Sequence, residues 1–272
     1  MATHKGDGSA PAGTVGKALD VLDAVAAFGR PVKFAELLAS SDHPKATLYR
    51  LVQTLVATGM LAYDPDRQVY GLGLRLVRLA HGAWAQASLA PLARPHLDRL
   101  SAQVGETVHL AQLDHGQVLY VDKRNARQPT AMFSDAGKVG PAYCTGVGKV
   151  MLAHLEAGAL DDALGEQAFR RYTDTTHVSA DTLRAELDDI RARGYGFDRE
   201  EHEPGIRCVA LPILTATGRL LGALSVTGPA DRVSYDSLEG QVPLIRGVAQ
   251  AIAADASDWG FPEPKAARVG TG

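Results

Sequence analysis

The sequence predicts an α+β protein in two parts: a small N-terminal domain of helices with one β-hairpin, and a larger domain in which helices cover an antiparallel sheet. The length of 272 residues exceeds that of one ordinary domain. Residues 14–72 show helical spacing of apolar residues that ends in one short hairpin, whereas several segments with strand character follow residue 91. An apolar fraction of 46% provides for a sizeable core.

The first helix is expected over residues 15–28, where apolar residues recur at helical spacing. We expect it to complete a three-helix core with the two helices that follow it. Glycine, alanine, serine and proline are frequent at both ends of the chain. Residues 1–13 and 258–272 are therefore expected to be disordered tails.

Residues 34–70 contain the most informative pattern of the chain. Residues 34–38 predict a short helix, a polar turn follows, and Pro44 stands where the start of a helix tolerates proline. A longer helix with a continuous apolar stripe begins at Lys45 and stops at a glycine. Residues 60–72 then predict a polar hairpin. This order of elements is typical of a winged helix-turn-helix, which reads DNA.

The polar face of the second helix and the tip of the hairpin are the expected DNA contacts, because a recognition helix enters the major groove with its N-terminal residues toward the bases. Two short helices and a hairpin also occur in domains that pack without DNA, and this alternative stays open. The expected contact positions are His43, Lys45, Ala46, Thr47, Tyr49, Arg50, Arg67 and Tyr70.

Residues 73–90 predict a helix that leaves the small domain and carries an apolar stripe. We interpret the stripe as a subunit interface, since the small domain offers little surface to cover it. Packing against the chain's own domain is the alternative. The stripe consists of Leu76, Leu79, Ala80, Ala83, Trp84 and Ala87.

The larger part alternates helices with strands that short turns join as hairpins, so an antiparallel sheet is expected. Ser179 is the expected cap of one of these helices. The predicted helices cover residues 92–104, 146–156, 180–193 and 238–254, and the predicted strands cover 107–114, 117–124, 130–135, 196–201, 207–214 and 220–227.

A ligand site is expected at the segment YCTGVGKVMLA, which places Gly146 and Gly148 in the first turn of a helix. Free backbone N–H groups there could hold an anion, and a carboxylate would suit them. An ordinary helix start with glycines for close packing is the alternative. Side chains on nearby predicted strands could line a small polar pocket, namely Asp198, Cys208, Ser225 and Thr227.

Other chemistries fit the sequence less well. Val150 stands where a phosphate loop needs Ser or Thr to bind magnesium. Residues 198–203 could be metal ligands, but adjacent carboxylates in a strand point to opposite faces and are usually solvated. No metal and no cofactor are expected. Cys208 could act as a nucleophile, but a cysteine with apolar neighbours is more often buried and inert. A metabolic enzyme with an N-terminal oligomerisation domain is the alternative function.

The formal net charge of −3 is unevenly distributed. Residues 1–90 contain nine Lys and Arg against seven Asp and Glu, whereas the rest contains nineteen against twenty-four. This balance suits a dimeric, sequence-specific DNA binder more than a protein that coats DNA. No apolar run approaches a membrane span and no signal core is visible, so a cytoplasmic protein without a membrane partner is expected.

Seven ordered stretches resemble the IclR family of transcriptional regulators over about residues 15–255. They read ALDVLDAV, PKATLYRL, YGLGLRL, ARPHLDRLSAQVGETVHLA, TGVGK, GYGFDREEHEPGIRCVALPI and LSVTGP. The resemblance implies a winged helix-turn-helix at residues 14–72, a dimerising linker helix at 73–90 and a GAF-like effector-binding domain at 91–257. The implied partners are a double-stranded DNA operator, a small-molecule effector that is usually a carboxylate, and further copies of the chain in a homodimer or homotetramer.

The resemblance also implies effector contacts at the helix N-terminus and on neighbouring strands. Ala46 and Tyr49 depart from the family's usual residues, so an operator sequence cannot be transferred. An architectural DNA-binding protein without a ligand is a further alternative. The implied effector contacts are Met132, as an apolar wall, and Gly146, Val147, Asp198, Cys208, Ser225 and Thr227.

Overall fold

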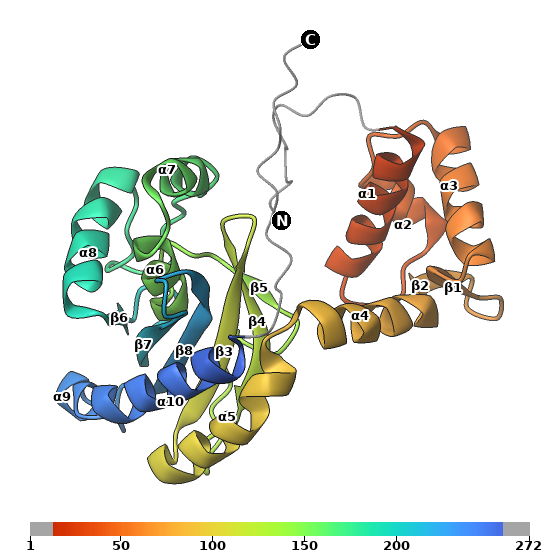
Figure 1. The fold of residues 1–272 in the computed structure, drawn as a ribbon. Helices are drawn as coiled ribbons and strands as arrows, with labels where there is room; N and C mark the ends of the chain where they lie inside the picture. The colour runs from red at the N-terminus through yellow and green to blue at the C-terminus, as the bar shows by residue number, and fades with distance from the viewer. Residues whose placement is uncertain (1–12, 258–272) are drawn as a thin grey trace. The chain divides into compact units, whose positions relative to one another are not determined.

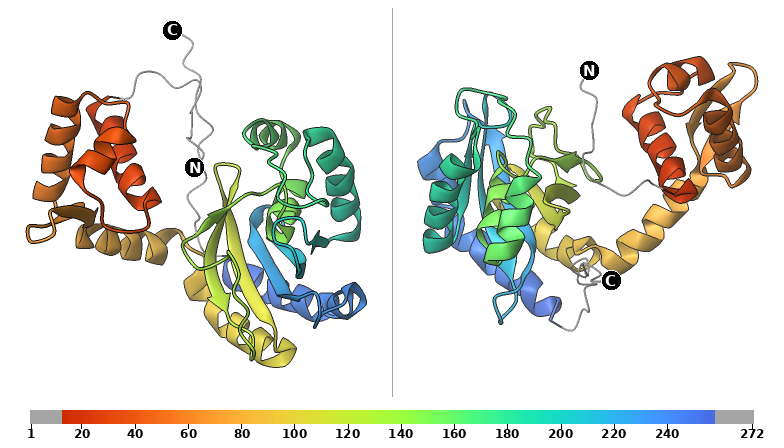
Figure 2. Two further views of the ribbon diagram at one scale, coloured as in Figure 1. Left: turned by 180° about the vertical axis from the view of Figure 1, so that it is seen from behind. Right: turned by 90° about the horizontal axis from the view of Figure 1, so that it is seen from above.

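A computed structural model of the chain describes residues 13–257. The expected tails lie outside the described residues, except Gly13, which precedes the first helix. The chain divides into two compact units, Met1–Gln86 and Ala87–Gly272. Both units are drawn in Figures 1 and 2.

The first unit is a three-helix core with a two-stranded hairpin, as the sequence predicts. Its interior is formed by apolar residues of all three helices and of the hairpin. Val32 pairs with Tyr70 in an isolated bridge that joins the loop after the first helix to the hairpin. The elements are α1 (Thr14–Ala27), α2 (Phe34–Ala39), α3 (Lys45–Ala57), β1 (Leu61–Asp64), β2 (Val69–Leu72) and α4 (Leu74–Ala87).

The second unit is built on one antiparallel sheet of the order β5-β4-β3-β8-β7-β6. The central pair, β3 and β8, comes from distant parts of the sequence, and each forms a further antiparallel pair on its other side. The strands are β3 (Thr107–Asp114), β4 (Gln117–Arg124), β5 (Val139–Gly140), β6 (Gly196–Arg199), β7 (Ile206–Leu214) and β8 (Leu220–Pro229).

Helices cover both faces of this sheet (Figure 1). On one face α5 (Ala90–Val104) and α10 (Val242–Asp255) pack against each other and the strands, with α9 (Tyr235–Glu239) beside β7. On the other face α6 (Gly146–Ala153) lies directly on the central strands. Two further helices pack against α6, namely α7 (Ala157–Gly165) and α8 (Ala180–Arg193).

Two predictions for this unit were wrong in detail, and one helix was missed. Residues 130–135 form no strand, because Phe133 N–H and the Ser134 side chain bond to side chains instead of a neighbouring strand. The single helix expected at 238–254 is two helices, α9 and α10, separated by Gly240 and Gln241. Helix α7 was not predicted. Helix α8 does begin after Ser179, whose hydroxyl accepts the N–H of Thr182.

No helix within residues 13–257 is both long enough and apolar enough to cross a membrane.

Candidate functional site

The exposed start of α3 carries most of the expected DNA contacts. This helix buries its apolar stripe in the core of the first unit. Its opposite face therefore leaves Lys45, Ala46, Tyr49 and Arg50 exposed to solvent, with Thr47 half-buried beside them. Tyr49 is 54% exposed, and its ring lies edge-on to that of Phe34 at 5.8 Å between centroids. A flat, partly anchored ring next to two cationic side chains is a surface that can meet a nucleic acid.

The two hairpin residues that were expected to contact DNA differ in their exposure. Arg67 lies exposed in the turn, whose backbone is held by Asp64 Oδ1 accepting the N–H groups of Asp66 and Arg67. Tyr70 is only 7% exposed and belongs to the core, with its ring 4.8 Å from that of Tyr63. We therefore do not retain Tyr70 as a DNA contact.

His43 is also less accessible than expected. Its side chain is 20% exposed, and its Nε2 atom lies 4.0 Å from Asp20 Oδ2 on α1. Its backbone N–H donates to Ser41 Oγ in the turn before α3. In this structure His43 helps to hold the turn, and only part of its side chain faces solvent.

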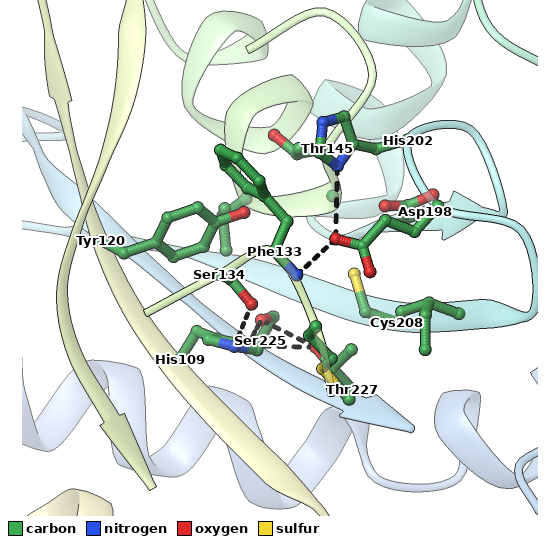
Figure 3. Close-up of a pocket in the computed structure, with 15 residues that line it drawn as sticks. His109, Tyr120, Phe133, Ser134, Thr145, Asp198, His202, Cys208, Ser225 and Thr227 are labelled. Atoms are coloured by element: carbon green, nitrogen blue, oxygen red, sulfur yellow. Dashed lines mark hydrogen bonds and ion pairs between the residues drawn. The ribbon is translucent and has the colours of Figure 1, made fainter. Parts of the chain in front are cut away.

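The second unit contains a pocket of about 410 Å³, counting its open mouth, between the start of α6, the sheet and residues 132–134 (Figure 3). All seven residues expected to contact an effector line it. The lining consists of His109, Tyr120, Met132, Phe133, Ser134, Thr145, Gly146, Val147, Asp198, His202, Glu203, Ile206, Cys208, Ser225 and Thr227.

Strand register explains why side chains from distant segments meet on this pocket. Asp198 on β6 pairs with Cys208 on β7, which pairs with Thr227 on β8. Two residues earlier on β8, Ser225 pairs with His109 on β3. Directly paired residues of antiparallel strands project from the same face. The sheet therefore presents a row of polar side chains beneath α6.

The start of α6 closes this row from above. A Cβ atom on Gly146 would lie 2.4 Å from Cys208 Sγ, so only glycine permits the approach. Thr145 does not cap the helix, because its hydroxyl donates to the Pro141 carbonyl at 2.8 Å. First-turn N–H groups have no partner within a helix, so this end suits an anion. Close packing also accounts for Gly148, whose Cβ would meet the Ala142 carbonyl at 2.4 Å.

His109 holds a hydroxyl cluster at one end of the pocket. Its Nε2 atom lies 2.7 Å from Ser134 Oγ, and its Nδ1 atom lies 3.3 Å from both Ser225 Oγ and Thr227 Oγ1 (Figure 3). Burial lowers the pKa of His109 to about 3, and the nearby Lys123 charge acts in the same direction. A neutral imidazole that both donates and accepts is therefore present at neutral pH.

Asp198 is buried at the opposite end of the polar row. Its Oδ1 atom accepts the backbone N–H of Glu201 at 2.8 Å. Burial and, to a smaller extent, the Glu201 carboxylate raise the pKa of Asp198 to about 8, although the Lys149 ammonium opposes the rise. At neutral pH this carboxyl group is mostly protonated, which makes it a hydrogen-bond donor as well as an acceptor.

The loop before β5 is tied down across the pocket. Phe133 N–H donates to Glu203 Oε1 at 2.5 Å, and the Phe133 ring lies edge-on to His202 at 5.1 Å (Figure 3). Burial lowers the pKa of His202, while the Glu203 charge acts in the opposite direction. This side of the pocket thus combines an aromatic surface with a carboxylate that already has a donor.

Residues 198–203 are not the solvated acidic run that was expected. Glu201 is buried, and the fully buried Lys149 of α6 pairs with it and, at 2.8 Å, with Glu186. His177 Nε2 lies 2.6 Å from Glu186 Oε2, so donor atoms of His177, Glu186 and Glu201 lie within 4.8 Å of one another. Lys149 already neutralises one oxygen of each carboxylate, and we assign the cluster to a buried ion-pair network.

Cys208 is poorly suited to act as a nucleophile. Burial raises the pKa of its thiol, and the Asp198 charge adds to the rise. The reactive form of cysteine is the thiolate, which is disfavoured here. The inert alternative named from the sequence therefore fits the geometry better.

Sequence reasoning missed several pocket residues. His109 stands between the apolar Val108 and Leu110, which is a usable signal, but its place depends on the non-local pairing of β3 with β8. Phe133 and Glu203 are 70 residues apart and carry no local signal of their contact. The missed lining residues are His109, Tyr120, Phe133, Ser134, Thr145, His202, Glu203 and Ile206.

Comparisons with known families cover almost the whole described chain. The model described as "IclR helix-turn-helix domain" matches residues 14–65, and that described as "Bacterial transcriptional regulator IclR C-terminal" matches residues 81–254. The chain is 31% identical to the HTH-type transcriptional regulator KdgR of Escherichia coli strain K12, covering 92% of this chain and 95% of that protein.

Solved structures share the fold. The Thermotoga maritima IclR structure has a TM-score of 0.68 at 27% identity, covering 89% of this chain and 97% of that one. An IclR homolog from Microbacterium hydrocarbonoxydans has a TM-score of 0.76 at 23% identity, covering 90% and 99%. At that identity the second likeness establishes the fold alone. Because the curated relative is named as a regulator and both matched domains are regulator domains, the metabolic-enzyme alternative is set aside.

Proposed function

Since this chain belongs to the IclR family of transcriptional regulators, we propose that residues 14–72 bind a double-stranded DNA operator and residues 91–257 bind a small carboxylate effector. The family establishes a regulator with a helix-turn-helix and an effector domain. The carboxylate, the residues that contact each partner and the oligomeric state are the proposed parts.

One observation carries the carboxylate proposal: the uncapped start of α6 and a row of polar side chains open on the same pocket. Backbone N–H groups of α6 would hold the carboxylate, and the hydroxyls of Ser225 and Thr227 would bind a second polar group. Met132 supplies an apolar wall. The M. hydrocarbonoxydans homolog was solved in complex with 4-hydroxybenzoate, a ligand with these two kinds of group.

A carboxylate screen tests this part. In a thermal-shift assay on the full chain, small carboxylates such as pyruvate and 4-hydroxybenzoate should raise the Tm, because a ligand that binds only the folded state stabilises it. Their uncharged amides, pyruvamide and 4-hydroxybenzamide, are the matched controls. Equal shifts by acid and amide would count against an anion site.

For DNA, we propose that α3 enters the major groove with Lys45, Ala46, Thr47 and Tyr49 toward the bases and Arg50 toward phosphate. Arg67 at the tip of the hairpin would contact the backbone or the minor groove. The support is their exposure on the face of α3 opposite to the core and in the turn of the hairpin.

The operator-binding proposal makes a direct prediction. Lys45→Ala together with Arg50→Ala should weaken operator binding at least tenfold and reduce the slope of its salt dependence by about one, because the Arg50 contact to phosphate is lost. The operator is found first by genomic footprinting of the purified protein. Binding is then measured by fluorescence anisotropy at several salt concentrations.

The control removes the same two charges elsewhere, from Lys17 on α1 and Arg219 in the turn between β7 and β8, both exposed. This variant should keep operator affinity within about twofold. Equal losses in both variants would show that only net charge matters. A wild-type protein with no preferred site in the footprint would contradict operator recognition altogether.

We propose that α4 mediates a dimer, because large apolar side chains on it face solvent. Leu74 is 82% exposed, Val77 63% and Leu79 52%. The surface differs from the stripe expected from the sequence, since Leu76 packs against the core of its own unit. A dimer would present two α3 helices to the two halves of one operator.

A further inference from the structure

Asp198 and the start of α6 lie next to each other on the pocket. The backbone N of Asp198 lies 3.3 Å from where a Cβ atom on Gly146 would be, so the two segments are in direct contact. Both line the pocket, and Figure 3 shows the Asp198 side chain beside Cys208 at the edge of the cavity. A carboxylate held by the first turn of α6 would therefore lie next to a second carboxyl group.

The groups that face Asp198 supply no spare positive charge. Lys149 of α6 is fully buried, but it is already paired with Glu186 and Glu201. Glu201 and Glu203, in the loop after β6, are acidic, and burial lowers the pKa of His202 between them. Burial raises the pKa values of the remaining neighbours, which are therefore uncharged. They are the thiols of Cys208 on β7 and Cys144 before α6, and the hydroxyls of Tyr120 on β4 and Tyr235 on α9.

No lysine or arginine is among the described residues that line the pocket. Two carboxylates that share a buried site without a cation between them cannot both be ionised at low cost. One proton must then stay with the pair. The ligand carboxylate has the α6 N–H groups as donors, whereas Asp198 has one backbone N–H, so the proton belongs on Asp198.

We propose that Asp198 carries its proton whenever a carboxylate effector is bound, and that it donates this proton in a hydrogen bond to the ligand. The inference rests on the proposed function, because it assumes that the effector is a carboxylate. It adds a specificity role for Asp198. The site binds an anion that accepts a hydrogen bond, and it binds this anion only when Asp198 is protonated. The proton comes from solvent when Asp198 is ionised in the free protein.

The pH dependence of carboxylate affinity follows from the protonation of Asp198 in the free protein. Burial, with the Glu201 charge adding to it, raises the pKa of Asp198 to about 8. Below that pH the binding-competent acid dominates and carboxylate affinity is flat. Above it the competent fraction falls tenfold per pH unit, and the apparent affinity falls with it. At pH 9.5 the affinity should be about thirtyfold below its value at pH 7, with uptake of close to one proton per ligand.

Isothermal titration calorimetry on the full-length chain tests this with pyruvate and benzoate as probes, because their carboxylates stay ionised and neither carries another group that titrates between pH 6.5 and 9.5. Titrations between pH 6.5 and 9.5, each in two buffers of different ionisation enthalpy, give affinity and proton uptake together. Asp198→Asn should bind both probes with no pH dependence and no proton uptake. The amide keeps an oxygen for the Glu201 N–H and still offers a donor to the ligand. Asp188→Asn, at an exposed position of α8, is the matched control and should behave as wild type.

Each outcome decides between the alternatives. Wild-type affinity that is flat to pH 9.5, or binding without proton uptake at that pH, would overturn the inference while leaving the carboxylate proposal intact. Affinity that rises with pH through this range would also overturn it, since an ionised Asp198 would then be the binding form. If neither acid binds at any pH, the proposed carboxylate effector fails first, and this inference fails with it. The wild-type titrations decide even if Asp198→Asn does not fold.

Discussion

Asp198 makes the stability of the free protein depend on pH. Burial, reinforced by Glu201, raises its pKa from an ordinary value of 3.8 to about 8 in the folded state. Between these values the unfolded chain has lost the proton and the folded chain keeps it. The folded state thus binds more protons, and stability falls as the pH rises through this window.

Asp198→Asn should remove this fall in stability with rising pH. The gain in unfolding free energy over wild type should be close to zero at pH 4 and grow toward pH 8, by at most about 1.4 kcal/mol per pH unit. Urea denaturation at pH 5, 6, 7 and 8 measures it. A gain that is the same at every pH would show that the substitution acts through packing and not through the charge of Asp198.

Gly146 is the residue that lets α6 approach the sheet. An added Cβ would lie 2.4 Å from Cys208 Sγ, and overpacking of this kind typically costs about 1–3 kcal/mol. Gly146→Ala should lower the Tm of the full chain by several degrees and weaken carboxylate binding. Adding Cys208→Ala should recover part of the stability, because it removes the clashing sulfur.

Gly158 on α7 is the matched control, since a Cβ there would meet nothing within 4 Å. Gly158→Ala should leave binding unchanged and stabilise the helix slightly. A Gly146→Ala variant with unchanged stability and affinity would show that the start of α6 does not define the pocket.

Residue-level prediction from the sequence succeeded where a motif was continuous and failed where contacts were distant. TGVGK and the strands after it identified the α6 end of the pocket. His109 joins Ser225 across 116 residues, and Phe133 reaches Glu203 across 70. No local periodicity encodes either contact: the first depends on the pairing of β3 with β8, and the second joins two loops that only the tertiary fold brings together.

At the scale of elements, the helices of the first unit were predictable because each carries a continuous apolar stripe. The strand predicted at residues 130–135 was wrong for a physical reason. Its backbone and side chains bond to Glu203 and His109, so tertiary contacts override a pattern that favours a strand. The hairpin of β3 and β4 was correct, because both strands and their tight turn are local in sequence.

Helix α4 carries the proposal about assembly. Val77→Asp places a charge on an apolar surface that is 63% exposed in the single chain, so the substitution should leave the fold intact. In a dimer the same charge would be buried without a partner, which is costly. The dimer dissociation constant should therefore rise at least tenfold in sedimentation-velocity experiments over a range of concentrations.

Val178→Asp is the control, because Val178 is another exposed valine, 42% accessible, that lies outside α4. It should sediment as the wild type does. A wild-type chain that stays monomeric at high concentration would contradict the proposed α4 dimer, and so would a Val77→Asp protein with unchanged self-association.

At the scale of the whole molecule, the two units carry separate chemistry. The first presents exposed cationic residues on α3 and in its hairpin, and the second encloses a polar pocket beneath α6. A regulator that responds to its effector requires a coupling free energy between these sites, typically about 1–3 kcal/mol. Such coupling is reciprocal by thermodynamic necessity, which distinguishes a ligand-controlled regulator from an architectural DNA-binding protein.

The most direct test measures both sides of this coupling on the full-length chain at pH 7. Operator affinity is determined with and without a saturating carboxylate, and carboxylate affinity is determined with and without saturating operator DNA. We expect both affinities to change by the same factor, on the order of 5- to 150-fold. A carboxylate that binds in the pocket while operator affinity stays the same would contradict the account.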